Sequence, residues 1–269
     1  MSAYERLKFE LCEYLRLYDA GLKKRANAHL KGAVSKFKSE FSEAERDYAL
    51  GELCREILDE TESELENLKS RGNGELPFEL GELVGEYLKK RCDAGEMPHL
   101  RWAYQIYTRC LRGLDKNDLL RRAYRHERCD ARTVELYFCM LLDALDWGAH
   151  HFPEGCLIER AYYEQLTREA CDAREKHEIS ARLNAEFEYL IKLYECYFEF
   201  KSRGGEGDFY ALCEKAGLNF APAKAFYYEG QNFTPCCCFN AVRILRSRAA
   251  KTHTRYLKTN AQGKLAKLY

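Results

Sequence analysis

Residues 130–152 read DARTVELYFCMLLDALDWGAHHF, and this stretch decides the fold class. Apolar residues recur in it at the three- and four-residue spacing of a buried helical face: Val134, Tyr137, Phe138, Leu141, Leu142, Leu145 and Ala149. The remaining positions are largely apolar too, so the pattern predicts a helix that other helices surround. Asp130 suits the N-cap, and Pro153 with Gly155 mark the expected end, because proline cannot continue the helical hydrogen bonds.

The same periodicity continues on both sides of this central helix. It predicts further helices, with N-caps at Ser42 and Ser180 and a glycine stop at 204–205. No stretch keeps the alternation of a half-buried strand for long, and only five prolines interrupt the 269 residues. We therefore expect an all-α multi-helix array of about ten to twelve helices, either superhelical or built of two abutting helical subdomains. A single domain over 1–269 is expected, with any subdivision near 113–118 or 152–156.

Composition points to a protein of a reducing compartment. The apolar run 137–142 is far shorter than the roughly 20 residues of a membrane span, and residues 1–6 lack a signal-peptide pattern. Thirteen cysteines, an odd number, favour reduced thiols over a disulfide framework. Four of them fall where helical stripes favour an apolar residue: Cys54, Cys92, Cys110 and Cys171. We expect a cytoplasmic protein with no membrane partner.

Charge is unevenly distributed although the net charge is zero. Residues 40–66 hold eleven acids against two arginines, and residues 230–269 hold eight basic residues and no acid. Four of these basic residues share one face of an expected helix over 235–258: Arg248, Lys251, Arg255 and Lys258. A second basic segment, with Tyr124 among its arginines, contains Arg121, Arg122, Arg125 and Arg128. These surfaces could bind nucleic acid, or the basic C-terminal region could dock on the acidic 40–66 segment of this or a second copy.

Two arginine-to-histidine spacings are similar to the R-x4-6-H signature of helical HEPN ribonucleases. They run from Arg121 to His126 and from Arg248 to His253. In such a pair the histidine would act as general acid or base on a ribose hydroxyl, and the arginine would stabilise phosphate charge. Chance alone supplies about two such spacings in this composition, and neither arginine is followed by the polar residue that the family favours. The spacing therefore keeps a ribonuclease as an alternative and assigns no family.

A third pattern lies at the C-terminal half of the central helix. Asp143, Asp146 and His150 are spaced three and four residues apart, so they would share one helical face. Carboxylates and an imidazole on adjacent turns can begin a metal site, which needs further ligands from another helix. The alternative is a histidine that interacts with the negative end of the helix dipole, oriented by Asp146.

Taken together, these patterns predict a non-catalytic protein–protein interaction or scaffold module that needs no cofactor. Its partner would be a protein, either a second copy or another chain, because abundant tyrosines suit amphipathic contacts. A nucleic-acid-binding protein or ribonuclease that uses the basic helices is the first alternative. A metal-binding helical-bundle enzyme is the second.

Overall fold

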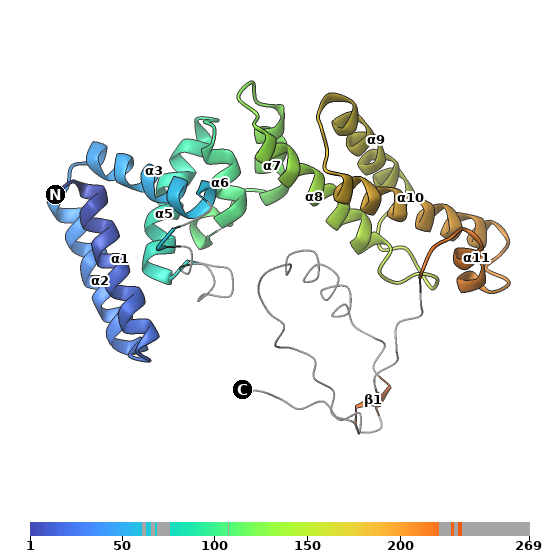
Figure 1. The fold of residues 1–269 in the computed structure, drawn as a ribbon, viewed down its shortest axis with the longest axis horizontal. Helices are drawn as coiled ribbons and strands as arrows, with labels where there is room; N and C mark the ends of the chain where they lie inside the picture. The colour runs from blue at the N-terminus through green and yellow to red at the C-terminus, as the bar shows by residue number, and fades with distance from the viewer. Residues whose placement is uncertain are drawn as a thin grey trace. The chain divides into compact units, whose positions relative to one another are not determined.

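The structure is a computed structural model that describes residues 1–60, 63–65, 68, 76–106 and 108–220, together with the pairs 227–228 and 231–232. Across this part of the chain the protein is all-helical, as the sequence predicts, with ten α-helices (Figure 1). The helices are α1 (Ala3–Asp19), α2 (Lys23–Glu40), α3 (Glu43–Asp59), α5 (Phe78–Asp93), α6 (His99–Ile106), the short 3₁₀ helix η1 (Arg109–Leu111), α7 (Lys116–Arg125), α8 (Ala131–Gly148), α9 (Arg160–Lys176), α10 (Ala181–Ser202) and α11 (Phe209–Lys215). Two-residue strands β1 (Tyr227–Tyr228) and β2 (Gln231–Asn232) pair antiparallel.

The chain divides into two compact units. Unit 1 comprises Met1–Met140 with Ala173–Ile179, and unit 2 comprises Leu141–Asp172 with Ser180–Tyr269. The boundary between these units lies inside α8, between Met140 and Leu141. Whether the chain folds as one domain or as two stays a prediction.

Unit 1 begins with α1 and α2, which lie side by side and are joined by a tight turn (Figure 1). Gly21 in this turn has φ +78°, a conformation that side-chain-bearing residues rarely adopt. Capping boxes start α1 at Ser2 and α3 at Ser42, where each serine and the glutamate three residues later exchange hydrogen bonds. The apolar faces of these helices and of α5 bury large aliphatic side chains, among them Leu7, Leu11, Leu30, Leu53, Leu80 and Leu88.

Unit 2 has an aromatic core. The ring of Phe152 stacks on Tyr197 at 3.9 Å between centroids, and Tyr163 stacks on Tyr194 at 4.4 Å. The fully buried Tyr194 donates a hydrogen bond of 2.9 Å to the carbonyl oxygen of Leu145 near the end of α8. The same carbonyl also accepts the backbone amide of Ala149 at 3.1 Å, so the tyrosine adds a second hydrogen bond and ties α10 to the end of α8.

The central helix α8 confirms most of the predicted pattern, including burial of Val134, Phe138 and Leu145. Asp130 caps it, since its Oδ1 accepts the backbone amide of Thr133 at 2.7 Å. The expectation that the helix continues to residue 152 is wrong: it ends at Gly148, whose carbonyl accepts the amide of Leu157 at 2.9 Å as the chain turns back. None of the described helices is both long and apolar enough to cross a membrane.

Candidate interaction groove

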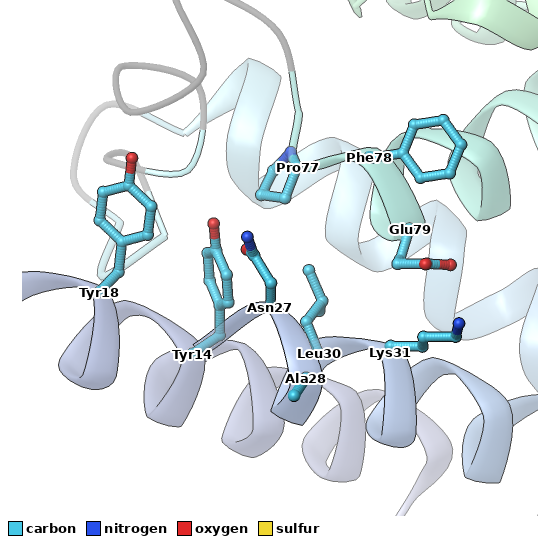
Figure 2. A pocket seen from close by; sticks show the side chains of 9 residues that line it. All are labelled: Tyr14, Tyr18, Asn27, Ala28, Leu30, Lys31, Pro77, Phe78 and Glu79. Atoms are coloured by element: carbon cyan, nitrogen blue, oxygen red, sulfur yellow. The ribbon is translucent and has the colours of Figure 1, made fainter. Parts of the chain in front are cut away.

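A groove of about 500 Å³ lies between α1, α2 and the first residues of α5, all within unit 1 (Figure 2). Its lining residues are Tyr14 and Tyr18 from α1, Asn27, Ala28, Leu30 and Lys31 from α2, and Pro77, Phe78 and Glu79. Tyr14 and Leu30 are almost fully buried, whereas the ring of Phe78 is 61% exposed. The groove therefore has an apolar base and an accessible aromatic side chain at its rim.

Local sequence explains how the groove is built. Pro77 is the N-cap of α5 in an extended conformation, so the chain enters that helix directly above the α1–α2 pair. Tyr14 and Tyr18 are one turn apart on α1, with ring centroids 5.8 Å apart, and therefore face the same side. The ammonium of Lys23 lies 5.2 Å from the centre of the Tyr18 ring, which is a cation–π distance.

The rim carries one charge of each sign. Lys31 comes from α2 and Glu79 from α5, and neither makes an ion pair with another described residue. Opposite charges on the two sides of an apolar groove would orient a bound segment, while the apolar base would supply most of the binding energy. The sequence alone did not reveal this groove, because it combines three helices. The sequence feature that could have pointed to the groove is Phe78, an apolar residue directly after Pro77, where α5 begins.

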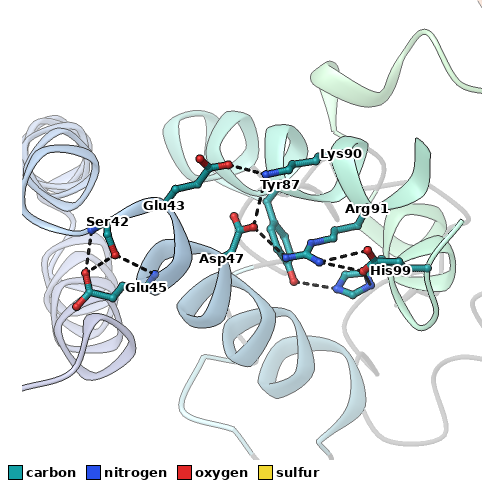
Figure 3. Close-up of polar contacts among 9 residues, drawn as sticks. Ser42, Glu43, Glu45, Asp47, Tyr87, Lys90, Arg91 and His99 are labelled. Atoms are coloured by element: carbon teal, nitrogen blue, oxygen red, sulfur yellow. Dashed lines mark hydrogen bonds and ion pairs between the residues drawn. The ribbon is translucent and has the colours of Figure 1, made fainter. Parts of the chain in front are cut away.

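A half-buried polar network joins α3 to α5 (Figure 3). Arg91 donates to Asp47 at 2.9 Å and to Glu96 at 3.1 Å, and the hydroxyl of Tyr87 lies 2.8 Å from Nε2 of His99. Nδ1 of His99 lies 3.6 Å from the Glu96 carboxylate, beyond hydrogen-bond distance, and it forms no hydrogen bond with a described residue. Tyr87 and His99 therefore form a hydrogen-bonded pair beside the Glu96 charge.

The Tyr87–His99 pair resembles part of an acid–base relay, but its environment favours a structural role. Burial raises the pKa of Tyr87 and lowers that of His99, so near neutral pH the phenol stays protonated and the imidazole uncharged. A Cβ on Gly51 would lie 3.0 Å from the Tyr87 hydroxyl, which shows how closely α3 covers that atom. The network thus fastens α3 to α5 and offers a substrate little access.

A second internal ion pair surrounds Arg101, which is only 3% exposed. Its guanidinium donates to both carboxylate oxygens of Asp59, at 2.5 and 3.1 Å, and Trp102 Nε1 donates to the same carboxylate at 2.9 Å. Asp130 also accepts from Arg101, at 3.3 Å. Burial would raise the pKa of Asp130, but hydrogen bonds from Thr133 and the Arg101 charge outweigh it and lower that pKa.

The residues predicted for a metal site lie at the end of α8. Asp143 is exposed and Asp146 half-buried, whereas His150 lies beyond the last helical residue, so the three do not share one helical face. The His150 ring stacks on Trp147 with centroids 5.9 Å apart, and burial together with His151 lowers its pKa. Among the described residues no group of three or more His, Cys, Asp or Glu side chains is placed to hold a metal ion. The metal site stays a prediction that lacks further described ligands.

Some residues of the basic segment on α7 make contacts within the protein. Arg122 donates to the carbonyl of Cys92 at 2.7 Å, and the ring of Tyr124 stacks on Tyr137 with centroids 4.0 Å apart. Nδ1 of His126 accepts the backbone amide of Arg128 at 3.0 Å. Arg121 is half-buried and Arg125 exposed. The predicted role of Tyr124 as a stacking platform for bases is disfavoured, because one face of its ring is already covered.

The other predicted nucleic-acid residues lie outside the described part of the chain: Arg248, Lys251, His253, Arg255 and Lys258. Five of the eleven acids of 40–66 form ion pairs with described residues of unit 1. The pairs are Glu43 with Lys90, Asp47 with Arg91, Glu52 with Arg55, Glu56 with Lys8, and Asp59 with Arg101. Docking of the C-terminal region on this segment stays a prediction.

Ten cysteines fall in the described part of the chain, and all are free thiols. Cys54, Cys92, Cys196 and Cys213 are buried, and burial raises the pKa of Cys92 and of Cys213 to about 12. The prediction of burial is confirmed for Cys54 and Cys92 and wrong for Cys171, which is exposed. The buried face of α9 consists instead of Leu166, Ala170 and Ala173.

The chain was also compared with known proteins, in sequence and in structure. Neither the protein-family models, nor the curated proteins, nor the solved structures gave a match. Of the features described above, the groove between α1, α2 and α5 is the one that combines volume, an apolar base and an exposed aromatic side chain.

Proposed function

We propose that the protein is a non-catalytic helical interaction module, and that it binds an extended or helical segment of a partner protein in the groove between α1, α2 and α5. The groove carries this proposal. An exposed phenylalanine beside a buried apolar base is what an anchoring side chain of a partner needs, because such contacts supply most of the energy of protein interfaces.

The chemistry of the groove defines the partner segment. One large apolar side chain would enter between Tyr14, Leu30 and Phe78, and an acidic residue beside it would meet Lys31. A basic residue on the other flank would meet Glu79. A volume of about 500 Å³ is within the range of ligand pockets, so the groove can hold such an anchor together with its neighbours. A reducing compartment such as the cytoplasm is part of the proposal, and the free thiols support it.

Selection of random peptides displayed on phage against the purified full-length protein tests the proposal. Enriched peptides should share an apolar anchor with an adjacent acidic residue, and Phe78→Asp should weaken their binding at least tenfold. Phe9→Asp is the matched control, because Phe9 is 62% exposed on α1 and does not line the groove. Equal loss of binding in both variants, or full binding by Phe78→Asp, would contradict the proposal. Sedimentation velocity on the same proteins shows whether the partner is a second copy.

A further inference from the structure

The solvent-facing side of α2 is strongly basic. Its exposed cations are Lys23, Lys24, Arg25, Lys31, Lys36 and Lys38, and the one acid of the helix is its last residue, Glu40. These basic residues precede the charged segments 40–66 and 230–269 in the sequence. They are spread over the 18 residues of one helix.

Most of this charge is not neutralised by the protein. Lys38 pairs with Glu86 at 3.2 Å, but Lys24, Arg25, Lys31 and Lys36 form no ion pair with any described residue. The neighbouring α5 differs: its Lys90 pairs with Glu43 at 2.5 Å. Four cations on one face of α2 thus remain available to an external anion.

The distribution of charge along α2 also opposes its own stability. Lys23, Lys24 and Arg25 occupy the first turn, where the helix dipole is positive, and the N-cap Leu22 forms no side-chain hydrogen bond there. Helices α1, α3, α7, α10 and α11 all begin with a serine or aspartate cap. Helix α5 also lacks a side-chain cap, but its first turn carries the acid Glu79. Three cations in the first turn thus distinguish α2 from these six helices, and such a local departure is expected where a segment has a task other than folding.

Helical geometry arranges the cations in two rows. Lys24, Lys31 and Lys38 are seven residues apart and form one row, about 21 Å long at 1.5 Å per residue. Arg25 and Lys36 lie about 100–120° around the helix, at the opposite edge of the exposed face. The positions between the rows carry the short side chains of Ala28, Gly32 and Ser35. A chain of negative charges could therefore run along the helix within reach of both rows.

The composition of this face favours phosphates over a protein partner. No large apolar side chain is exposed between Lys23 and Glu40, so a folded partner would find no anchor there. Lysine is depleted in protein interfaces but suits phosphate as a mobile point charge. We propose that the exposed face of α2 binds the sugar–phosphate backbone of nucleic acid without reading its sequence. Ala28 and Lys31 also line the groove, but Lys24, Arg25 and Lys36 do not, so this inference goes beyond the proposed groove function.

The test compares the full-length protein with the variant Lys24→Glu/Arg25→Glu/Lys36→Glu. A fluorescein-labelled 20-nucleotide single-stranded RNA and a 20-base-pair DNA duplex serve as probes, and fluorescence anisotropy is recorded from 50 to 300 mM KCl. Each phosphate contact contributes about 0.7 (single strand) to 0.9 (duplex) to the slope of log K against log salt. Loss of three contacts should therefore reduce the slope by roughly 2–3, and affinity at 100 mM KCl should fall at least tenfold.

A matched control carries the same charge change on exposed cations elsewhere: Lys89→Glu/Arg112→Glu/Lys215→Glu. It should change affinity less than threefold. The α2 variant should melt no lower than the wild type, because glutamates at 24 and 25 suit the positive end of the dipole, so weaker binding cannot reflect unfolding. Unchanged binding by the α2 variant would assign the activity to other basic residues and overturn the proposal. So would no binding of either probe at 50 mM KCl, or binding confined to polyglutamate or to anionic lipid vesicles.

Discussion

Two glycines in the middle of helices should respond in opposite ways to the same substitution. Gly32 lies on the exposed face of α2, and a Cβ added there would meet nothing within 4 Å. Gly85 lies within α5, and its Cβ would meet Oγ1 of Thr108 and would lie 2.8 Å from Cβ of Cys110. The segment 108–111 packs so closely on α5 that only a residue without a side chain fits between them.

The expected magnitudes follow from two effects. Replacing glycine by alanine inside a helix stabilises the protein by roughly 0.5–1 kcal/mol, and at Gly32 nothing opposes this gain. Overpacking costs about 1–3 kcal/mol, and Gly85 belongs at the upper end of that range. The Thr108 side chain can rotate away, but Cβ of Cys110 is fixed to its backbone, so η1 itself must move. The net loss for Gly85→Ala should be about 1–2 kcal/mol.

Urea unfolding followed by tryptophan fluorescence measures both variants. Trp102 is 5% exposed and reports on unit 1, whereas Trp147 is 54% exposed and should change little. Gly32→Ala should raise the urea midpoint and Gly85→Ala should lower it, with circular dichroism confirming equal helix content. Adding Thr108→Ala to Gly85→Ala should restore only part of the loss. A Gly85→Ala protein as stable as Gly32→Ala would refute the close packing of η1 on α5.

Two further predictions concern the buried polar groups of unit 1. Asp59→Ala should destabilise the protein by about 2–3 kcal/mol in the same urea assay. This is somewhat less than the usual cost of leaving a buried charge without its partner, because Asp130 still accepts a hydrogen bond from Arg101. An unchanged urea midpoint would show that the Asp59–Arg101 pair does not stabilise the protein. Burial lowers the pKa of His99, so this histidine binds a proton more readily in the unfolded chain than in the folded protein. The free energy of unfolding should therefore decrease as the pH falls through about 6.5 and below. Comparing the pH dependence of wild type and His99→Phe isolates this contribution, and identical slopes between pH 7.5 and 5.5 would contradict it.

Local patterns were sufficient to predict the helices. The buried face of α8, the N-caps Ser42 and Ser180, and the glycine stop after α10 all depend on residues within a few positions of one another. Such short-range spacing reflects helical geometry directly, so it can be read without knowing the tertiary fold. The end of α8 was misplaced because Leu157 returns to pair with Gly148, a contact that no local pattern encodes.

The candidate surfaces were harder to predict because they depend on packing. Arg101 and Asp59 are 42 positions apart, and the groove combines α1, α2 and the start of α5. Charge counts over long segments also do not show internal pairing: acids of 40–66 pair with Lys8 of α1, Arg91 of α5 and Arg101 of α6. The basic face of α2 was detectable from the seven-residue spacing of Lys24, Lys31 and Lys38, a period that averaged charge does not reveal.

The chemical reactivity of the buried thiols can report local opening of each unit separately. Cys54 and Cys92 belong to unit 1, and Cys196 and Cys213 to unit 2. A thiol that is hidden from solvent reacts with an alkylating reagent only while its surroundings are open. The rates at which these four side chains acquire the label, read by mass spectrometry of peptides, would therefore give the opening frequency of each unit separately, without any engineered residue.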